Sequence, residues 1–568
     1  MNALSGWTTT ANTAVGVEGN IMRVNVLSCR LWSTLTLVSL FLLTPAVLRA
    51  EDPVEVDASI YADAADALRA GELLENNRQW VEAINHYEAT LERFTDDEGL
   101  KYGLRRTRIH FGVDRRYSDR SFEEKLLTKG RAEALDLFED ILSRVQYEYV
   151  EPVKETRFVA HGTESLYMAL KNDRFTAKNK IDDKTEAIDR VRQVLIKDFW
   201  NRRIDSRMQA RSTITAVCDL CQRELGISGT VVAMEYIFGG CNALDEYSNF
   251  LTPDRYNDLF GSIQGELVGI GIEMKGVKGR GMHLVNVLFN SPAEHGGLQP
   301  DDYLVAIDGT DCKDLSTDDA ARLLRGTSGS KVKLTYESPD GAQKTGDFIR
   351  QRVQIHSVTR KLMLDQASGI GYIRMEGFQN NTAEELDEAL RGLERQGMKA
   401  LIWDLRGNPG GLLETAAAVI DRFIDRGVLV STKGRSPEQN QVFQAHGNNV
   451  RHYPLALIVD ENSASASEIV AGAIRDHHRG KIVGRKTYGK WSVQSIIHLP
   501  GDTGLKLTTA KFYSPDDKNY SGKGLAPDVE VPEPKDLQYS FYRGRTTEEI
   551  SADPDVAEAI EILQNQLQ

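Results

Sequence analysis

A chain of 568 residues is too long for a single hydrophobic core and predicts about three or four domains. Its apolar fraction of 41% and charged fraction of 27% are those of an ordinary soluble globular protein. The formal net charge of −14 argues against a nucleic-acid partner, because binding to phosphate requires a basic face.

The N-terminal segment has the three-part layout of a secretory signal. Residues 35–48 (LTLVSLFLLTPAVL) are apolar, two arginines precede them, and the small residue Ala50 stands where cleavage would fall. We therefore predict a signal peptide over 1–50, with Met22 as an alternative start, and an exported protein that is periplasmic or extracellular. The alternative is an uncleaved segment that anchors the protein in a membrane, although the run is short for a full span.

The next two regions are expected to be helical. Residues 54–115 predict a helical hairpin that resembles a single tetratricopeptide-type repeat, and it either docks a partner protein or only packs on the next domain. Residues 120–262 have apolar residues at helical spacing and predict a helical N-terminal domain, with a more charged insertion over 172–228. Cys218 and Cys221 share a helix face there, and half of a zinc site without a second ligand pair is weak evidence. The cysteines are therefore interpreted as buried, with one disulfide among them as an open alternative.

The hydrophobic period changes in residues 264–350, where short β-type runs surround two helix candidates. The pattern resembles a PDZ domain of the bacterial, circularly permuted kind, which implies a groove that accepts a peptide as an added strand. Glycines in its first loop would let backbone N–H groups converge on the terminal carboxylate of the peptide. The alternative is a small barrel without a ligand. The residues predicted to bind the peptide are Val268, Gly269, Ile270, Gly271 and Ile272.

Residues 355–535 alternate strands and helices, which is typical of an α/β domain with helices packed on a sheet. The runs ALIWDL and LALIVD are almost wholly apolar and predict central buried strands, and catalytic groups in such folds lie at strand ends. A strand segment is expected to close this core, and residues 536–568 are expected to form a helical tail. The chain as a whole is therefore predicted to be a multidomain α+β protein.

The segment ENSASASEIVAGAIRD (461–476) places a serine at a predicted strand-to-helix turn. The helix that starts near Ser465 would point free backbone N–H groups at this position, and only small side chains surround it. A serine hydroxyl needs a base to act as a nucleophile, and the chain lacks the G-x-S-x-G motif of the α/β hydrolases. Taken alone, Ser465 would be interpreted as a helix N-cap.

Lys490 is a candidate base in the loop GRKTYGKWSVQ (484–494). Burial beside Tyr488 and Trp491 would lower the pKa of its amine from about 10.4 to roughly 7–8, so that a neutral amine can accept the serine proton. Taken alone, it would be a solvated surface lysine. The loop nearly matches the phosphate-binding pattern G-x-x-x-x-G-K, but Trp491 replaces the Ser or Thr that holds magnesium, so we reject a nucleotide site.

Together these segments resemble the carboxyl-terminal processing peptidases, also called tail-specific proteases, over about residues 135–567. The family pattern S-A-S-A-S-E-I is present at 463–469, and Lys490 follows Ser465 by 25 residues, as the family's lysine follows its serine. The resemblance implies a Ser465/Lys490 catalytic dyad in a crotonase/ClpP-like core. It also implies that Gln494, four positions after the lysine, orients the amine.

The resemblance further implies an oxyanion hole at the loop DLRGNPGG (404–411). Its two donors would be the backbone N–H groups of Ala466 and Gly411, with Gly410 as the alternative to Gly411. Each such donor is worth roughly 10²–10³ in rate. One departure from the family is Trp491, which replaces a glycine and could strain the loop or narrow the cleft.

The function that the resemblance implies is that of an exported serine endopeptidase, which cleaves polypeptides near their C-termini after a PDZ domain captures the tail. No metal or organic cofactor is implied. The expected partners are polypeptides with free C-terminal tails and, through residues 54–115, another protein; a membrane is involved only if the signal is uncleaved. Two alternatives stay open: an inactive scaffold that only binds partners, and a peptidase that trims short peptides without tail specificity.

Overall fold

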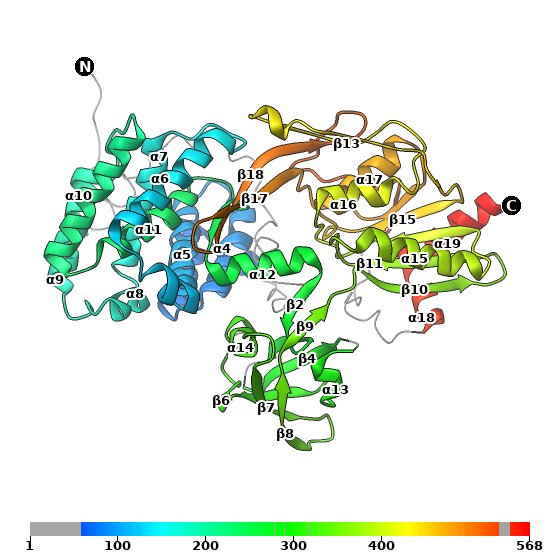
Figure 1. Ribbon diagram of the computed structural model, residues 1–568, viewed down its shortest axis with the longest axis horizontal. Coiled ribbons are helices and arrows are strands. Elements are labelled where there is room, and N and C mark those ends of the chain that lie inside the picture. Colours follow the sequence, from blue (N-terminus) through cyan, green and yellow to red (C-terminus); the bar gives the residue numbers. More distant parts are fainter. Residues whose placement is uncertain (1–57, 278, 289, 316, 533–545) are drawn as a thin grey trace.

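The computed structural model describes residues 58–277, 279–288, 290–315, 317–532 and 546–568, so the predicted signal peptide lies outside them. Figure 1 shows a helical domain on the left, an α/β domain on the right and a β-rich domain below them. Along the chain the helical domain comes first, the β-rich domain second and the α/β domain third. None of the described helices is long and apolar enough to cross a membrane.

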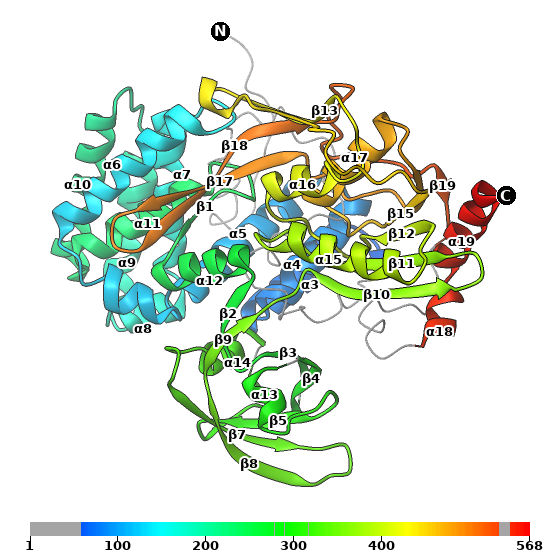
Figure 2. The ribbon, with the colours of Figure 1, turned by 45° about the vertical axis from the view of Figure 1, so that its right-hand side comes forward.

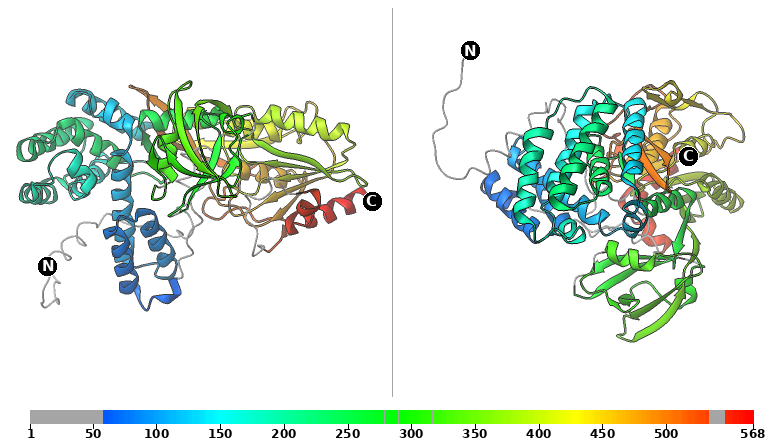
Figure 3. Two further views of the ribbon diagram at one scale, coloured as in Figure 1. Left: turned by 90° about the horizontal axis from the view of Figure 1, so that it is seen from below. Right: turned by 60° about the vertical axis from the view of Figure 1, so that its left-hand side comes forward.

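The first helices pack around the ring of Tyr87. A Cβ atom added to Gly71 would lie 2.3 Å from Tyr87 Cζ, and one added to Gly103 would lie 2.6 Å from the same atom. Glycine at both positions therefore lets two helices close on one aromatic side chain. Figure 3 shows these helices projecting from the rest of the helical domain. They are α3 (Ala64–Asn76), α4 (Trp80–Arg93) and α5 (Glu98–Arg116), after η1 (Ala58–Ile60).

The helices from η2 to α11 share one hydrophobic core, which also takes in the end of α5. The stretch 172–228 contributes to that core through Ile188, Ile214 and Val217. Cys218 and Cys221 are buried in it and carry free thiols. The elements are η2 (Phe122–Leu126), α6 (Arg131–Glu148), α7 (Glu155–Ala169), α8 (Asp173–Lys178), α9 (Thr185–Val194), η3 (Leu195–Phe199), α10 (Arg207–Leu225), α11 (Gly229–Cys241), β1 (Asn249–Leu251) and α12 (Pro253–Gln264).

The β-rich domain is joined to the rest by the antiparallel pair β2 and β9. Its sheet has the strand order β3-β4-β5-β7-β8, with β6 paired to β5, and an apolar core of its own. The strands and helices are β2 (Glu266–Gly269), β3 (Ile272–Val277), β4 (Gly281–Val287), α13 (Pro292–His295), β5 (Tyr303–Ile307), β6 (Thr310–Asp311), α14 (Thr317–Leu324), β7 (Lys331–Glu337), β8 (Gln343–Ile349) and β9 (Gln351–Gln354).

A six-stranded sheet with the order β10-β11-β12-β15-β16-β19 forms the centre of the α/β domain. The strands from β11 onward run parallel, so their carboxyl ends lie along one edge. The predicted strands ALIWDL and LALIVD are β12 and β15, in the middle of the sheet. The strands are β10 (Val358–Asp365), β11 (Ile370–Met375), β12 (Ala400–Asp404), β15 (Leu455–Val459), β16 (Lys481–Gly484) and β19 (Val529–Glu530).

Helices cover both faces of this sheet. On one face α15 (Thr382–Arg395), α16 (Leu413–Ile420) and α17 (Ala466–Asp476) pack against strand residues such as Trp403 and Leu457. On the other face α18 (Thr547–Ser551) and α19 (Pro554–Leu567) pack against the alternate strand residues, such as Ile402 and Ile458. The C-terminal helices are therefore a structural layer of the α/β domain, red in Figure 2.

A second sheet links the α/β domain to the helical domain. Its long hairpin of β17 and β18 reaches the helices, where Leu499, Leu505 and Leu507 enter their core and β1 pairs with β18. At its other end β18 pairs with β13. The strands are β13 (Val428–Gly434), β14 (Val442–Gln444), β17 (Ser492–Leu499) and β18 (Thr503–Tyr513), with η4 (Pro437–Gln439) between β13 and β14.

Candidate active site

Ser465 lies at the turn between β15 and α17, as the sequence predicts, and its backbone is strained. Its φ of 54° and ψ of −112° are values that residues other than glycine rarely adopt. Such strain persists only where the surroundings hold it, and it gathers at functional sites. The serine on one side, Ser463, donates its Oγ proton toward Leu405 O and Asp460 Oδ1, both at 2.9 Å. The serine on the other side, Ser467, donates to Asn408 O at 2.9 Å.

Asn408 binds the glycine loop to the serine turn. Its backbone carbonyl accepts hydrogen bonds from the N–H of Ala464 and the Oγ of Ser467, and its side-chain Oδ1 accepts from the N–H of Gly410 at 2.9 Å. A Cβ atom on Gly410 would lie 2.8 Å from both Ala466 N and Ser465 Cβ. The loop therefore lies directly against the nucleophile candidate, and only glycine fits at that position.

The two candidate oxyanion donors on this loop differ in what their N–H groups already bind. The N–H of Gly410 is used by Asn408. The N–H groups of Gly411 and Ala466 have no acceptor among the residues that the structure describes. The geometry thus favours Gly411 over Gly410 as the companion of Ala466.

Lys490 is buried between β16 and β17, with 4% of its side chain exposed. Its Nζ lies 4.7 Å from the centre of the Tyr247 ring, which comes from the helical domain. Burial holds the pKa of the Lys490 amine well below its usual range, and the nearby Lys506 lowers it further. The carboxylates of Glu246, Asp245 and Glu468 act in the opposite direction. The net effect lowers the pKa and so favours the neutral form of the amine.

Glu468 connects the lysine loop to the serine turn and is fully buried. Its carboxylate accepts hydrogen bonds from the N–H of Ser465 at 3.0 Å and from the N–H of Lys490 at 2.8 Å. It also accepts from Gly489 N, Thr487 Oγ1 and Trp491 Nε1. Glu468 lies inside the motif at 463–469, but the motif alone predicts no role for it. The available signal was its position three residues after Ser465, where a carboxylate can cap the backbone of the turn.

The two residues of the predicted dyad lie on neighbouring loops but are not hydrogen-bonded to each other. Among the described residues no hydrogen bond connects Ser465 Oγ with Lys490 Nζ. Gln494, expected to orient the amine, instead donates its side-chain N–H to Ser492 Oγ at 2.9 Å and Thr508 Oγ1 at 3.3 Å. Catalytic hydrogen bonds often shorten only when substrate is bound.

Trp491 neither strains its loop nor lies in an open cleft. It is 1% exposed, its backbone φ is negative, and its ring stacks on Phe512 at 4.7 Å and meets Tyr520 edge-on at 4.8 Å. Its indole N–H donates a hydrogen bond to Glu468 Oε1 at 3.0 Å. The large side chain that replaces the family's glycine therefore fills the core behind the site.

The five residues predicted to bind a peptide terminus lie in the β-rich domain. Val268 and Gly269 are on β2, Ile272 begins β3, and Ile270 is buried between them. The carbonyl of Ile270 accepts from Ala293 N at 2.8 Å, which ties the loop to the start of α13. Gly271 has a φ of 80°, and a Cβ there would lie 2.4 Å from Ser291 Cβ. The loop therefore requires its second glycine.

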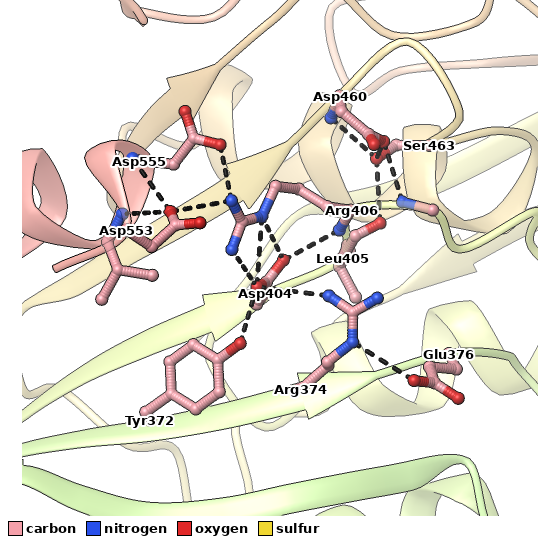
Figure 4. Close-up of polar contacts among 12 residues, drawn as sticks. Tyr372, Arg374, Glu376, Asp404, Leu405, Arg406, Asp460, Ser463, Asp553 and Asp555 are labelled. Atoms are coloured by element: carbon pink, nitrogen blue, oxygen red, sulfur yellow. Dashed lines mark hydrogen bonds and ion pairs between the residues drawn. The ribbon is translucent and has the colours of Figure 1, made fainter. Parts of the chain in front are cut away.

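An ion-pair network surrounds Asp404 and Arg406, at the start of the glycine loop (Figure 4). Arg406 is 1% exposed and pairs with Asp404 of β12 and with two carboxylates that precede and open α19, Asp553 and Asp555. Arg374 and Tyr372 of β11 also bind Asp404. The arginines hold the pKa of the Asp404 carboxyl well below its usual range, so it stays ionised.

A strained serine at a helix start, a buried lysine on a neighbouring loop and backbone N–H groups without an acceptor among the described residues are groups that a serine-type peptidase could use. Known families agree: residues 369–531 match the model of peptidase family S41, and residues 285–338 match a PDZ domain. The chain is 36% identical to a carboxyl-terminal-processing protease of Synechocystis over 52% of this chain and 72% of that protein. It is 34% identical to the protein of that name from Picosynechococcus, over 51% of this chain and 70% of the relative.

The chain therefore belongs to peptidase family S41, among the carboxyl-terminal-processing proteases, and carries a PDZ domain. Among solved structures, it is similar to the photosystem II D1 C-terminal processing protease. That likeness has 26% identity and a TM-score of 0.37, over 71% of this chain and 95% of the other.

Proposed function

We propose that this peptidase cuts polypeptides near their C-termini with a Ser465/Lys490 dyad, after its PDZ domain has captured the substrate tail. The observation that carries the proposal is the burial of Lys490, which is 4% exposed and lies in a loop bound to the same Glu468 carboxylate as the turn of Ser465. A buried amine of lowered pKa can act as a general base near neutral pH. The names of the relatives support the choice of substrate end.

The reaction begins when Ser465 Oγ attacks the scissile carbonyl carbon and its proton passes to Lys490 Nζ. The tetrahedral oxyanion accepts hydrogen bonds from the N–H groups of Ala466 and Gly411. The C–N bond then breaks, and the departing amine takes the proton from Lys490. Water then attacks the acyl ester and gives a proton to the same amine. The bond between the acyl carbon and Ser465 Oγ breaks, Lys490 returns the proton to Oγ, and the acid leaves.

In the structure the Lys490 amine lies 4.7 Å from the centre of the Tyr247 ring and makes no hydrogen bond to Ser465 Oγ among the described residues, so the first proton transfer requires the two groups to come into contact. Substrate that enters the site and excludes water would favour this contact. Gln494 has no part in this step in the described state, because its amide serves Ser492 and Thr508.

The PDZ domain would hold the free C-terminus of the substrate at Val268–Ile272, with the tail added to a strand edge. The permuted strand order of that domain and a crotonase/ClpP-like class for the catalytic core remain part of the proposal. So does a partner protein on the helices of 54–115. Export to the periplasm or the extracellular space rests on the apolar run 35–48, with membrane anchoring if that run is not cleaved.

The test is cleavage of an unstructured reporter by the purified protein, its Ser465→Ala variant and its Lys490→Ala variant. We expect both variants to lose cleavage, and a serine-directed fluorophosphonate to label the wild type but not Lys490→Ala. Full activity of Ser465→Ala would contradict the dyad. Absence of both cleavage and labelling in the wild type would support the inactive scaffold.

A second comparison tests the tail specificity. The same reporter with an amidated C-terminus should be cut more slowly, because amidation removes the anion that the PDZ loop is proposed to hold. Equal rates for the two reporters would favour a peptidase without tail recognition.

A further inference from the structure

The C-terminal helix α19 is bound to the first residues of the two loops that carry the proposed oxyanion donor and the proposed general base. Its Asp555 accepts from Arg406 Nη1 at 2.6 Å and from Arg485 Nη1 at 2.8 and 2.9 Å. Arg406 follows β12 and precedes the glycines of the oxyanion loop, whereas Arg485 follows β16 and precedes Lys490. One carboxylate therefore bridges two loops that are about 80 residues apart in sequence.

This bridge is buried. Asp555 is 0% exposed and Arg406 is 1% exposed, so neither charge is screened by water. Asp553 helps to hold the helix end: its side chain accepts from the N–H groups of Asp555 and Val556 and pairs with Arg406 at 2.9 Å. Helix α19 itself is fixed on the sheet by Val556, Ala559 and Leu563. A carboxylate placed in this way transmits the position of the helix to both arginines.

From each arginine a short chain of contacts leads to the site. Next to Arg406, the N–H of Gly407 donates to Asp460 Oδ1 at 2.9 Å, and Asp460 also binds Ser463 of the serine turn. Next to Arg485, Thr487 donates to Glu468, which holds the N–H of Lys490. Moving either arginine would therefore move the frame of the nucleophile, the oxyanion donors and the base.

We propose that Asp555 is a positioning residue of the active site, and that the C-terminal helix is required for catalysis as well as for folding. This rests on the proposed Ser465/Lys490 mechanism. The residue lies beyond 369–531, the part of the chain that the peptidase family model matches, so that match assigns it no role. It acts through Arg406 and Arg485 and touches no reacting atom.

The decisive variant is Arg485→Gln in the full-length protein, because it frees the lysine loop from α19 and leaves the Asp555–Arg406 pair in place. We expect kcat to fall about 10-fold or more with KM within twofold, because small displacements of catalytic groups cost up to about 10² in rate. The acidic limb of the activity profile should move to higher pH, since a looser loop admits water to Lys490. Arg485→Lys should recover part of kcat.

Asp555→Asn should lower kcat more than Arg485→Gln does. The matched control is Glu561→Gln, which replaces an exposed carboxylate on the same helix and should leave the rate unchanged. If Asp555→Asn fails to fold, Arg485→Gln decides alone. A kcat and pH profile of Arg485→Gln like those of the wild type would overturn the proposal.

Hydrogen exchange separates this proposal from the proposed function. The amides of Gly489 and Lys490, which bind Glu468, should exchange faster in Arg485→Gln than in the wild type, whatever the substrate is. Unchanged exchange there would overturn the positioning role. Cleavage that does not depend on Ser465, together with faster loop exchange in Arg485→Gln, would instead reject the dyad and leave the positioning role standing.

Discussion

The two halves of the site are held in different ways. The serine turn is built almost entirely from short contacts within the α/β domain: Ser463, Ser467 and Asn408 fix a strained backbone over a few residues. The environment of Lys490 is assembled from outside its own loop, by Tyr247 and Glu246 of the helical domain and by Lys506 of β18. Placement of the nucleophile is thus local, whereas protonation of the base depends on how the domains pack.

Glu468 is where these two halves meet, so its replacement should have the largest effect. In Glu468→Gln one side-chain oxygen is replaced by an N–H donor that faces the donors of Ser465, Lys490 and their neighbours. We expect kcat to fall about 10²–10³-fold and the free energy of unfolding to drop by about 2–4 kcal/mol. Reporter cleavage and urea unfolding measure the two effects, with Glu384→Gln on exposed α15 surface as control. Wild-type kinetics in Glu468→Gln would mean that the loops are held independently of each other.

Tyr247 tests whether the helical domain controls the base. Tyr247→Ala should admit water to the Lys490 amine, raise its pKa toward the ordinary value and cost on the order of 10–100-fold in activity at pH 7. Tyr247→Phe keeps the ring and should stay close to the wild type. The measurement is kcat/KM against pH for both variants, and an unchanged profile in Tyr247→Ala would show that the α/β domain alone sets the pKa of Lys490.

Lys506 gives a smaller effect of known sign. Its positive charge lowers the pKa of Lys490, so Lys506→Met should raise that pKa and move the acidic limb of the activity profile to higher pH. A shift of one unit would cost about tenfold on that limb. Lys506→Arg keeps the charge and is the control; a profile shifted equally by both variants would attribute the effect to packing.

Stability should respond as well. Burial lowers the pKa of Lys506 itself to about 8, so between about pH 8 and pH 10.5 the unfolded chain binds a proton there that the folded protein does not. The free energy of unfolding should therefore rise with pH across this window by up to about 1.4 kcal/mol per unit from this group. Lys506→Met should flatten that rise, as measured by urea unfolding at a series of pH values.

The sequence predicts the local half of the site well. A contiguous motif with small residues after an apolar strand places Ser465 and Ala466 at a helix start, and the loops of Gly411 and Lys490 follow strands of the same sheet. Adjacent parallel strands place their carboxyl ends together, so the meeting of these three loops follows from the order of the strands. The strand and helix alternation likewise predicts the α/β domain.

The non-local half has no comparable signal. Tyr247 lies 243 residues before Lys490 and belongs to the helical domain, which is joined to the hairpin after Lys490 by the pairing of β1 with β18. The bond from Asp555 to Arg406 spans 149 positions. Contacts of this kind depend on tertiary packing, which residue periodicity does not encode. The expectation that Trp491 strains its loop or narrows the cleft is wrong for the same reason, because its ring is buried against Phe512 of β18 and Tyr520 of the loop that follows.

Replacement of Gln494 should have the smallest effect on activity. It tests whether this side chain has the role that the family pattern implies or only the contacts seen in the structure. The family pattern implies that it orients the amine, but here its side-chain N–H binds Ser492 and Thr508 within the β17–β18 hairpin. Gln494→Ala should therefore reduce kcat less than about threefold and lower the free energy of unfolding by about 1 kcal/mol, the usual worth of such hydrogen bonds. A loss of 100-fold or more with unchanged stability would show that Gln494 changes partners when substrate binds, so that the base, too, is positioned by residues near it in sequence.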